Sequence, residues 1–288
     1  MRLLKKKLFI LPVFFCFLSF SGKLSACTLW AASGDKVEGG GSLLAKNRDY
    51  RPAPDQVCTL ETVKPSQAYE YTALIRTHRD KKYVKAGVNE KGLAIVSSTA
   101  SSVEDDNDVH TVKNVCAGIL ASCDSVDAAL GKKDIFSNAK PFNFMLADKN
   151  KIALVEIGPE GKFESKIIQN GTLCQTNHYI LDGMKWANEK KIGRSSLERL
   201  KRIEELLNTR NGKFTLQDFI RFSEDRNAGP DNSIWRTGSS PKLSRTLATW
   251  IIHIPENGKP VVYLKTANPG EDINTFKPFI PDCVKTKN

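Results

Sequence analysis

Cys27 is notable because it directly follows a segment with the features of a secretory signal. That segment opens with one arginine and three lysines, and residues 8–20 are almost all apolar. The apolar stretch has 13 residues, whereas a membrane-spanning helix needs about 20. Ala26 is the kind of small residue that precedes a signal cleavage site. The sequence therefore predicts a signal peptide over residues 1–26, export to the periplasm or the medium, and a mature chain that begins with Cys27.

Cleavage at this point would place two reactive groups on one residue. A free α-amine titrates at a pH of about 8, so it is partly neutral at physiological pH and can accept a proton. The Cys27 thiol would then have its own general base, directly or through one water molecule, and could attack a carbonyl carbon. Such an acyl-transfer enzyme needs no catalytic histidine, and the chain has only 4 histidines.

Charged residues follow Cys27 at a distance that a hairpin would bring back to it. Two strands are expected on either side of a turn-rich stretch at residues 34–41. If they pair around this turn, Asp49 returns beside Cys27, where its carboxylate could hold the α-amine. Lys46 or Arg48 would then lie close enough to favour the thiolate. Taken alone, such a charged run is more typical of an exposed strand end than of a functional site.

The hydrophobic patterns predict alternating groups of strands and helices. Strands are expected at residues 28–33, 42–46, 83–98 (two strands around a turn at 88–92), 142–147, 152–157, 163–168, 172–175, 243–254 and 261–266. Helices are expected at residues 111–123, 125–130 and 215–224, and from a capping box at Ser195 and Glu198 that precedes an apolar face of Leu197, Leu200, Ile203, Leu206 and Leu207. Residues 225–241 are expected to form a loop. This order predicts an α+β fold with mainly antiparallel sheets.

Five short segments resemble, in order, those of the choloylglycine hydrolase and penicillin V acylase family. They are Cys27-Thr28, Lys46-Asn47-Arg48-Asp49-Tyr50, Gly87 to Leu93, Thr176-Asn177-His178 and Ser244-Arg245. That family belongs to the N-terminal nucleophile hydrolases. The resemblance implies a four-layer αββα sandwich in one domain over residues 27–288. It also implies hydrolysis of a linear amide C–N bond through an S-acyl intermediate.

The resemblance further implies a role for each matching residue. Cys27 is expected to be the nucleophile, Asp49 to orient its α-amine, and Asn177 to donate a hydrogen bond to the oxyanion. Arg245 is expected to balance the charge near the thiolate. A backbone N–H near Ser98 or Thr99 is expected to be the second oxyanion donor, although the family often has Asn or Tyr there.

One position departs from the family pattern. The family's arginine falls on Lys46, which keeps the charge but loses the planar, bidentate guanidinium. Arg48 is the alternative for this role, and otherwise it is expected to bind substrate together with Thr99.

The resemblance implies a small N-acyl amide as substrate and no metal or organic cofactor. N-acyl amino acids, conjugated bile acids, phenoxyacetyl-type penicillins and acyl-homoserine lactones all fit this class. Transfer of the acyl group to another amine is an alternative to hydrolysis, because both reactions use the same acyl-enzyme. No Cys/His spacing typical of zinc sites occurs in the sequence.

The charge distribution does not indicate nucleic-acid binding. The predicted signal peptide holds five positive charges and no acidic residue, so its removal lowers the net charge from +11 to +6. The remaining charges lie in mixed-sign runs such as residues 79–82, which are typical of solvated surface. The sequence leaves open whether the chain forms homo-oligomers.

Two other interpretations of Cys27 remain open. Residues 24–27 also fit a bacterial lipoprotein box, in which lipid and acyl groups would block both the thiol and the amine of Cys27. The protein would then be a lipid-anchored binding protein at the surface. Alternatively, His178 or His110 could be the base of a Cys/His hydrolase with another fold.

Overall fold

The computed structural model describes residues 26–104 and 110–285, so the predicted signal peptide lies outside the described residues except for Ala26. The strands are β1 (Ala26–Ser33), β2 (Ser42–Tyr50), β3 (Cys58–Val63), β4 (Tyr71–His78), β5 (Lys81–Asn89), β6 (Ala94–Thr99), β7 (Phe142–Ala147), β8 (Ile152–Ile157), β9 (Phe163–Ile168), β10 (Gly171–Gln175), β11 (Arg245–Ile254), β12 (Val261–Thr266) and β13 (Asn274–Phe279). The helices are α1 (Val115–Ser122), α2 (Val126–Gly131), α3 (Lys133–Ser137), α4 (Arg194–Asn208), α5 (Leu216–Ser223), α6 (Gly229–Asn232) and α7 (Asp282–Lys285). No helix in these residues is long and apolar enough to cross a membrane.

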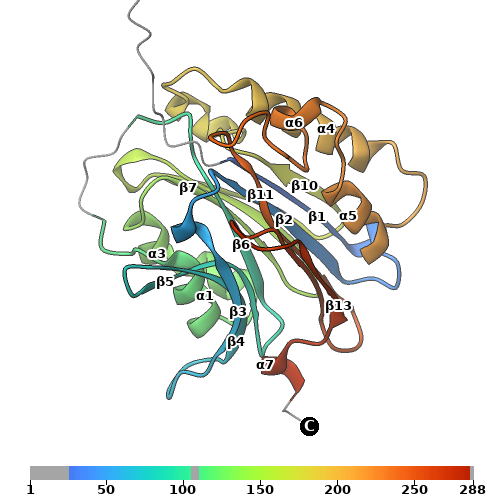
Figure 1. The fold of residues 1–288 in the computed structure, drawn as a ribbon. Helices are drawn as coiled ribbons and strands as arrows, with labels where there is room; N and C mark the ends of the chain where they lie inside the picture. Colours follow the sequence, from blue (N-terminus) through green and yellow to red (C-terminus); the bar gives the residue numbers. More distant parts are fainter. Residues whose placement is uncertain (1–25, 105–109, 286–288) are drawn as a thin grey trace, which may run out of the picture.

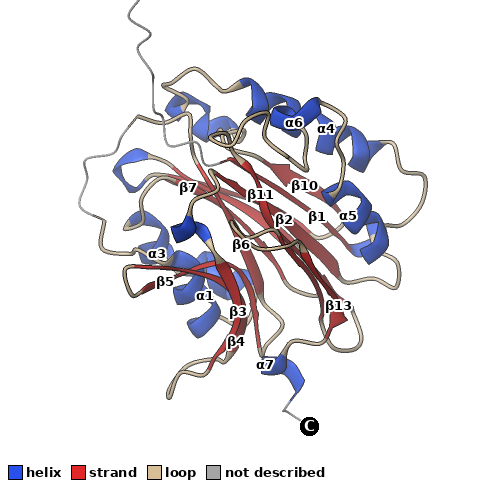
Figure 2. Cartoon of the chain, viewed as in Figure 1, coloured by secondary structure: helices blue, strands red, loops and turns tan. Residues whose placement is uncertain are grey.

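Two antiparallel sheets form the middle of the molecule (Figures 1 and 2). Within the described residues, the first sheet has six strands in the order β10-β1-β2-β11-β12-β13. The second sheet has seven strands that follow the chain order from β3 to β9. Consecutive strands of the second sheet are therefore neighbours, whereas the first sheet combines strands from both ends of the described chain.

Three apolar clusters separate the layers. Leu29, Leu44 and Met145 belong to the cluster between the two sheets. Trp30 packs with Phe219 of α5 and other side chains on the outer face of the first sheet, and α1 to α3 cover the outer face of the second. Fully burying such a side chain stabilises the fold by about 1.5–3 kcal/mol. The layers are thus helix, sheet, sheet, helix, which confirms the expected α+β sandwich.

The side chains of β1 alternate between the two faces of the first sheet. Leu29 and Ala31 contact the cluster between the sheets, whereas Trp30 and Ala32 contact the helices. Since successive side chains of a strand point to opposite faces, the Cys27 side chain lies on the same face as Leu29. The thiol therefore faces the space between the two sheets.

The register of β1 and β2 corrects one detail of the expected hairpin. Ser33 pairs with Ser42, and this register places Arg48, rather than Asp49, opposite Cys27. Asp49 pairs with Ala26 and so lies on the face of the sheet that the helices cover. A shift of one residue is enough to exchange the two faces of a strand.

The predicted start of α4 is also wrong. Gly193 precedes the helix without a side-chain cap, and the hydroxyl of Ser195 donates to the backbone oxygen of Asp231 instead. The buried face of the helix consists of Ser196, Arg199, Ile203 and Leu207, whereas Leu197 is 47% exposed. Near the start of the helix, the polar residues Ser196 and Arg199 therefore occupy the buried face, where leucines had been predicted.

Several elements were not predicted. Strands β3, β4 and β13 and the short helices α3, α6 and α7 lie in stretches for which no element was expected. Helix α1 begins at Val115, four residues later than expected. Most residues of β3 and β13 are partly exposed, because both are edge strands, and their apolar pattern is correspondingly weak.

Substitution of Gly41 should test how tightly the turn between β1 and β2 is constrained. Gly41 has a φ of +82°, and an added Cβ would overlap the backbone oxygen of Ile254 and lie 2.7 Å from the nitrogen of Glu256. We expect Gly41→Ala to lower the free energy of unfolding by about 1–2 kcal/mol for the backbone conformation and by about 1–3 kcal/mol more for the overlap. Urea unfolding followed by circular dichroism measures both losses together.

Gly39→Ala is the matched control, because Gly39 has a φ of +76° but no atom within 4 Å of an added Cβ. It should show only the backbone loss of about 1–2 kcal/mol. Equal losses in the two variants would show that the contact with β11 does not constrain the turn.

Candidate active site

Cys27 borders a cavity of about 160 Å³ between the two sheets. The lining residues come from β1, β2, the turn after β2, strands β4 to β7 and the segment before β7. They are Cys27, Lys46, Arg48, Asp49, Tyr50, Gln56, Arg76, Lys85, Ser97, Ser98, Thr99, Lys140 and Phe142. The structure thus brings together Cys27, Asp49, Lys46, Arg48 and Thr99, all of which were predicted from the sequence as site residues.

Lys46 connects the two sheets beside this cavity. Its side chain is 2% exposed, and its Nζ donates to the backbone oxygens of Lys85, at 3.1 Å, and of Ser97. Burial lowers the pKa of Lys46, whereas the nearby Cys27 has the opposite effect. Lys46 therefore places a positive charge near the thiol and fastens β2 to β5 and β6.

Arg48 lies opposite Cys27 and is 4% exposed. Its Nη2 donates to Oε1 of Gln56 at 2.7 Å, and its guanidinium lies 5.8 Å from the centre of the Tyr50 ring. Its Nη1 has no hydrogen-bond partner among the described residues. Arg48 thus offers an unused donor at the wall of the cavity.

Asn177 follows β10 and contacts the backbone nitrogen of Cys27. That N–H donates to Oδ1 of Asn177 at 2.9 Å, and Nδ2 of Asn177 donates to the backbone oxygen of Thr99 at 2.8 Å. Since an amide nitrogen carries two hydrogens, Thr99 uses only one of them. Asn177 therefore joins the nitrogen of Cys27 to the end of β6.

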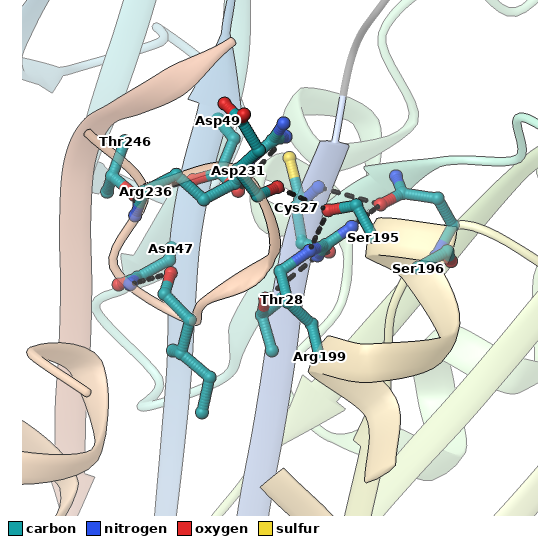
Figure 3. Close-up of polar contacts among 12 residues, drawn as sticks. Cys27, Thr28, Asn47, Asp49, Ser195, Ser196, Arg199, Asp231, Arg236 and Thr246 are labelled. Carbon is teal, nitrogen blue, oxygen red and sulfur yellow. Dashed lines mark hydrogen bonds and ion pairs between the residues drawn. The ribbon is translucent and has the colours of Figure 1, made fainter. Parts of the chain in front are cut away.

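Arg199 of α4 is the main site residue that the sequence analysis missed. Its guanidinium is buried and donates to the backbone oxygen of Cys27, to Oγ1 of Thr28 at 2.9 Å and to Oδ1 of Asn177 at 2.9 Å. Figure 3 shows this side chain reaching from the helix to β1. Burial lowers the pKa of Arg199 to about 10, while the carboxylate of Asp49 opposes that change. The side chain remains charged at neutral pH.

Asp49 lies on the helix side of β2 and is 0% exposed. Its Oδ1 accepts a hydrogen bond from Oγ1 of Thr246 at 2.8 Å, and its Oδ2 lies 3.9 Å from Nη1 of Arg236 (Figure 3). Burial raises the pKa of Asp49 to about 6, although Arg236 and Arg199 both lower it. Its Oδ2 accepts no hydrogen bond from the described residues. One carboxylate oxygen is therefore left without a donor at the end of β1.

Arg245 begins β11 opposite Tyr50 and lines a different cavity, together with Trp235 and Arg236. The structure does not place it among the described residues that line the cavity of Cys27. The guanidinium groups that lower the pKa of Asp49 belong to Arg236, Arg199 and, to a smaller extent, Arg48. Of Arg236 and Arg199, only Arg199 could have been predicted to be buried from its position in the sequence. It lies four and eight residues before the buried Ile203 and Leu207.

His178 is buried next to Asn177, and both residues contact the hydroxyl of Ser196. Its Nδ1 lies 2.9 Å from Oγ of Ser196 and 3.4 Å from Oγ1 of Thr176. Burial and the nearby Arg199 lower the pKa of His178 to about 4, so its ring is neutral at physiological pH. His110, the other histidine considered, is partly exposed and adjoins residues that the structure does not describe.

Replacing Arg199 should show how much the site depends on it. Arg199→Met would remove one donor from the oxygen of Cys27 and one from Oδ1 of Asn177, and would leave Asp49 with one fewer cation. We expect a loss of about 3–5 kcal/mol in the free energy of unfolding, as for other broken buried charge networks. Urea unfolding measures this loss.

Arg202→Met is the control on the same helix, since Arg202 forms a partly exposed ion pair with Asp225. Such pairs contribute about 1 kcal/mol or less. A similarly small loss for both variants would contradict a supporting role for Arg199.

The comparisons with known proteins agree with this fold. The family model of acyl-coenzyme A:6-aminopenicillanic acid acyl-transferase matches residues 37–270. No curated protein sequence matches the chain. Among solved structures, penicillin V acylase from Agrobacterium tumefaciens is 18% identical, with a TM-score of 0.55 over 84% of this chain and 83% of that chain.

Two other solved structures are similar. A mutant of the conjugated bile acid hydrolase from Clostridium perfringens is 16% identical, with a TM-score of 0.53 over 87% of this chain and 96% of that chain. The N-acylethanolamine-hydrolyzing acid amidase orthologue of Caenorhabditis elegans is 11% identical, with a TM-score of 0.53 over 80% and 94% of the two chains.

These matches confirm the resemblance to N-terminal nucleophile hydrolases that the sequence motifs indicated. The chain belongs to the family of acyl-coenzyme A:6-aminopenicillanic acid acyl-transferase, which comprises amide hydrolases and acyl-transferases of the N-terminal nucleophile hydrolase fold.

Proposed function

We propose that the protein is exported and cleaved before Cys27, and that it then hydrolyses the linear amide bond of a small N-acyl substrate. The observation that carries this proposal is the position of Cys27. Its nitrogen is 2.9 Å from Oδ1 of Asn177, and its side chain borders a cavity between the sheets. Cleavage would turn this nitrogen into a free amine on the residue that also supplies the thiol.

The surroundings of Cys27 suit a base of this kind. The positive charges of Arg199 and Lys46 disfavour the protonated form of an amine at the position of the Cys27 nitrogen. Asn177 can orient the amine through Oδ1, and Oδ2 of Asp49, at the same end of β1, accepts no hydrogen bond from the described residues. A neutral, oriented amine can take the proton of the thiol.

The reaction then proceeds in two acyl-transfer steps. The thiolate of Cys27 forms a bond to the carbonyl carbon while the α-amine holds the proton. The negative oxygen that develops accepts a hydrogen bond from the second Nδ2 hydrogen of Asn177 and from a backbone N–H near Thr99. The C–N bond breaks as the α-ammonium gives its proton to the leaving amine. Water next attacks the thioester, which releases a carboxylic acid and restores the thiol.

The two other interpretations fit these contacts less well. A lipid on the thiol would have to fit into the cavity that Cys27 borders, where Cys27 is only 4% exposed. As a base for the thiol, His178 would have to leave Ser196 and Thr176, and its pKa of about 4 makes it a poor proton acceptor at neutral pH.

An amide screen tests the proposed reaction and its nucleophile together. Wild-type protein, Cys27→Ser and Cys27→Ala are incubated with N-acyl amino acids, bile-acid conjugates, phenoxyacetyl penicillin and acyl-homoserine lactones, and the released amines are measured. We expect the wild type to release amine from at least one class and Cys27→Ala to release none. Because the alkoxide of serine is harder to form than a thiolate, Cys27→Ser should also lose nearly all of its activity.

Cys174→Ser is the matched control, because Cys174 is a partly exposed cysteine on the adjacent strand β10. Mass spectrometry of the purified protein should find a mature chain that begins with an unmodified Cys27. A lipid on Cys27, or turnover that persists in Cys27→Ala, would overturn the proposal.

Asn177→Ala tests the oxyanion donor. Loss of one such donor lowers kcat by about 10²–10³ in acyl transfer, with little effect on KM. Asn170→Ala is the control, since the side chain of Asn170 is exposed and bonds to Asp35 in the turn region. Unfolding curves of both variants separate a catalytic effect from a loss of structure. A kcat within threefold of the wild type in a folded Asn177→Ala would exclude this role.

Acyl transfer to an amine is the second candidate, because the matching family model is that of an acyl-transferase. Adding hydroxylamine to the hydrolysis assay separates the two reactions. A transferase forms hydroxamate in preference to acid, whereas a hydrolase with a water-accessible thioester continues to form mainly acid.

A further inference from the structure

More cationic than acidic side chains line the cavity beside Cys27. Five cationic side chains border it, from Lys46, Arg48, Arg76, Lys85 and Lys140, and Asp49 is the only acidic residue among the described residues of its lining. Arg76 forms an ion pair with Asp55 at 2.8 Å, and the nearby Cys27 raises the pKa of Lys46.

The ion pair of Asp49 is with Arg236 and not with Arg48 or Lys85. Asp49 lies on the helix side of the first sheet, and the positive charges that act on it most strongly are those of Arg236 and Arg199. The charges of Arg48 and Lys85 are therefore not matched by an acidic partner in an ion pair among the described residues.

Arg48 has a buried hydrogen-bond donor that the described part of the fold does not use. Its side chain is almost fully buried, Gln56 holds one nitrogen of the guanidinium, and Nη1 is left without a partner among the described residues. An unpaired buried donor costs free energy, so this group gains from any acceptor that enters the cavity. A guanidinium binds a carboxylate or another oxyanion best.

Lys85 faces Arg48 from the second sheet. Burial and the positive charges of Arg48 and Lys46 lower the pKa of Lys85 to about 7. Its ammonium thus lies close to other positive charges. An anion that enters the cavity would offset the repulsion between them and favour the protonated form of Lys85.

A second, more apolar cavity of about 90 Å³ adjoins the first and shares Lys85, Ser97, Lys140 and Phe142 with it. Val84, Val115 and Phe144 form part of its apolar wall. A substrate that spans both cavities would combine an apolar portion with a polar portion beside the thiol.

We propose that the substrate is an anionic N-acyl amide, and that Arg48 and Lys85 bind its carboxylate or other oxyanion beside the scissile bond. This inference rests on the proposed amide hydrolysis and names its substrate class. Neutral amides such as N-acylethanolamines and acyl-homoserine lactones lack the anion and are poor substrates.

Matched pairs of compounds test the charge requirement. Hexanoylglycine and phenylacetylglycine are compared with their glycinamide analogues, which differ only in the carboxylate. An N-alkyl succinamic acid and its methyl ester test an anion on the acyl side of the bond instead. We expect kcat/KM to favour the anionic member of at least one pair by about tenfold or more, the effect of one charged hydrogen-bonded contact.

Lys85→Gln and Arg48→Gln should each reduce that preference to near one, because the loss of a cation lowers kcat/KM for the anionic member of a pair far more than for the neutral member. Lys81→Gln is the matched control, because Lys81 is an exposed lysine on the same strand outside both cavities. It should keep the wild-type preference. Persistence of the full preference in both cavity variants would overturn the assignment of these residues.

Calorimetric binding to the Cys27→Ala protein separates this inference from the proposed reaction. Tighter binding of the anionic member of a pair supports the inference even if no amide is hydrolysed. Equal binding of both members, or binding of neither in every pair, overturns it, and it does so even when the wild type hydrolyses neutral amides.

Discussion

The site depends on one buried cation, the guanidinium of Arg199, which binds two segments that are far apart in the sequence. It donates to the oxygen of Cys27 and to Oδ1 of Asn177, so the same group fixes the first strand and the residue that follows β10. Its burial is costly for a charged group, and Asp49 offsets part of that cost. The helix α4 therefore acts as a support for the start of β1 rather than only as a cover for the sheet.

The first sheet separates the cations of β2 from the carboxylate of the same strand. Alternation along β2 directs Lys46 and Arg48 toward the space between the sheets, whereas Asn47 and Asp49 face the helices. Asn47 makes three buried hydrogen bonds there, to the oxygens of Ser223 and Ile234 and to Thr249. A four-residue stretch thus supplies both the cations of the cavity and the buried support behind the nucleophile.

The order of strands and helices predicted an α+β fold, and the resemblance to the family implied the four-layer sandwich. The residues near Cys27 were predicted because they lie in a hairpin whose strands are strongly apolar. The sequence did not predict the register, since one residue of error in the turn exchanges Asp49 with Arg48. Arg199 was missed because a charged residue on a helix is usually exposed, and its role depends on a strand 172 positions earlier. Arg236 lies in a stretch that was expected to be a loop, and only the tertiary structure brings it to Asp49.

The hydrogen bonds from Lys46 to the oxygens of Lys85 and Ser97 join the first sheet to the second, and the two sheets contribute different groups to the site. On one side, the first sheet and α4 hold the nucleophile and its supporting groups. On the other, β5, β7 and the start of α1 supply most of the wall of the adjoining apolar cavity. Changes in that wall can alter which molecule fits while the reacting groups keep their places. Diversification of the family toward new acyl groups could therefore proceed through the second sheet alone, with the chemistry of the first sheet retained.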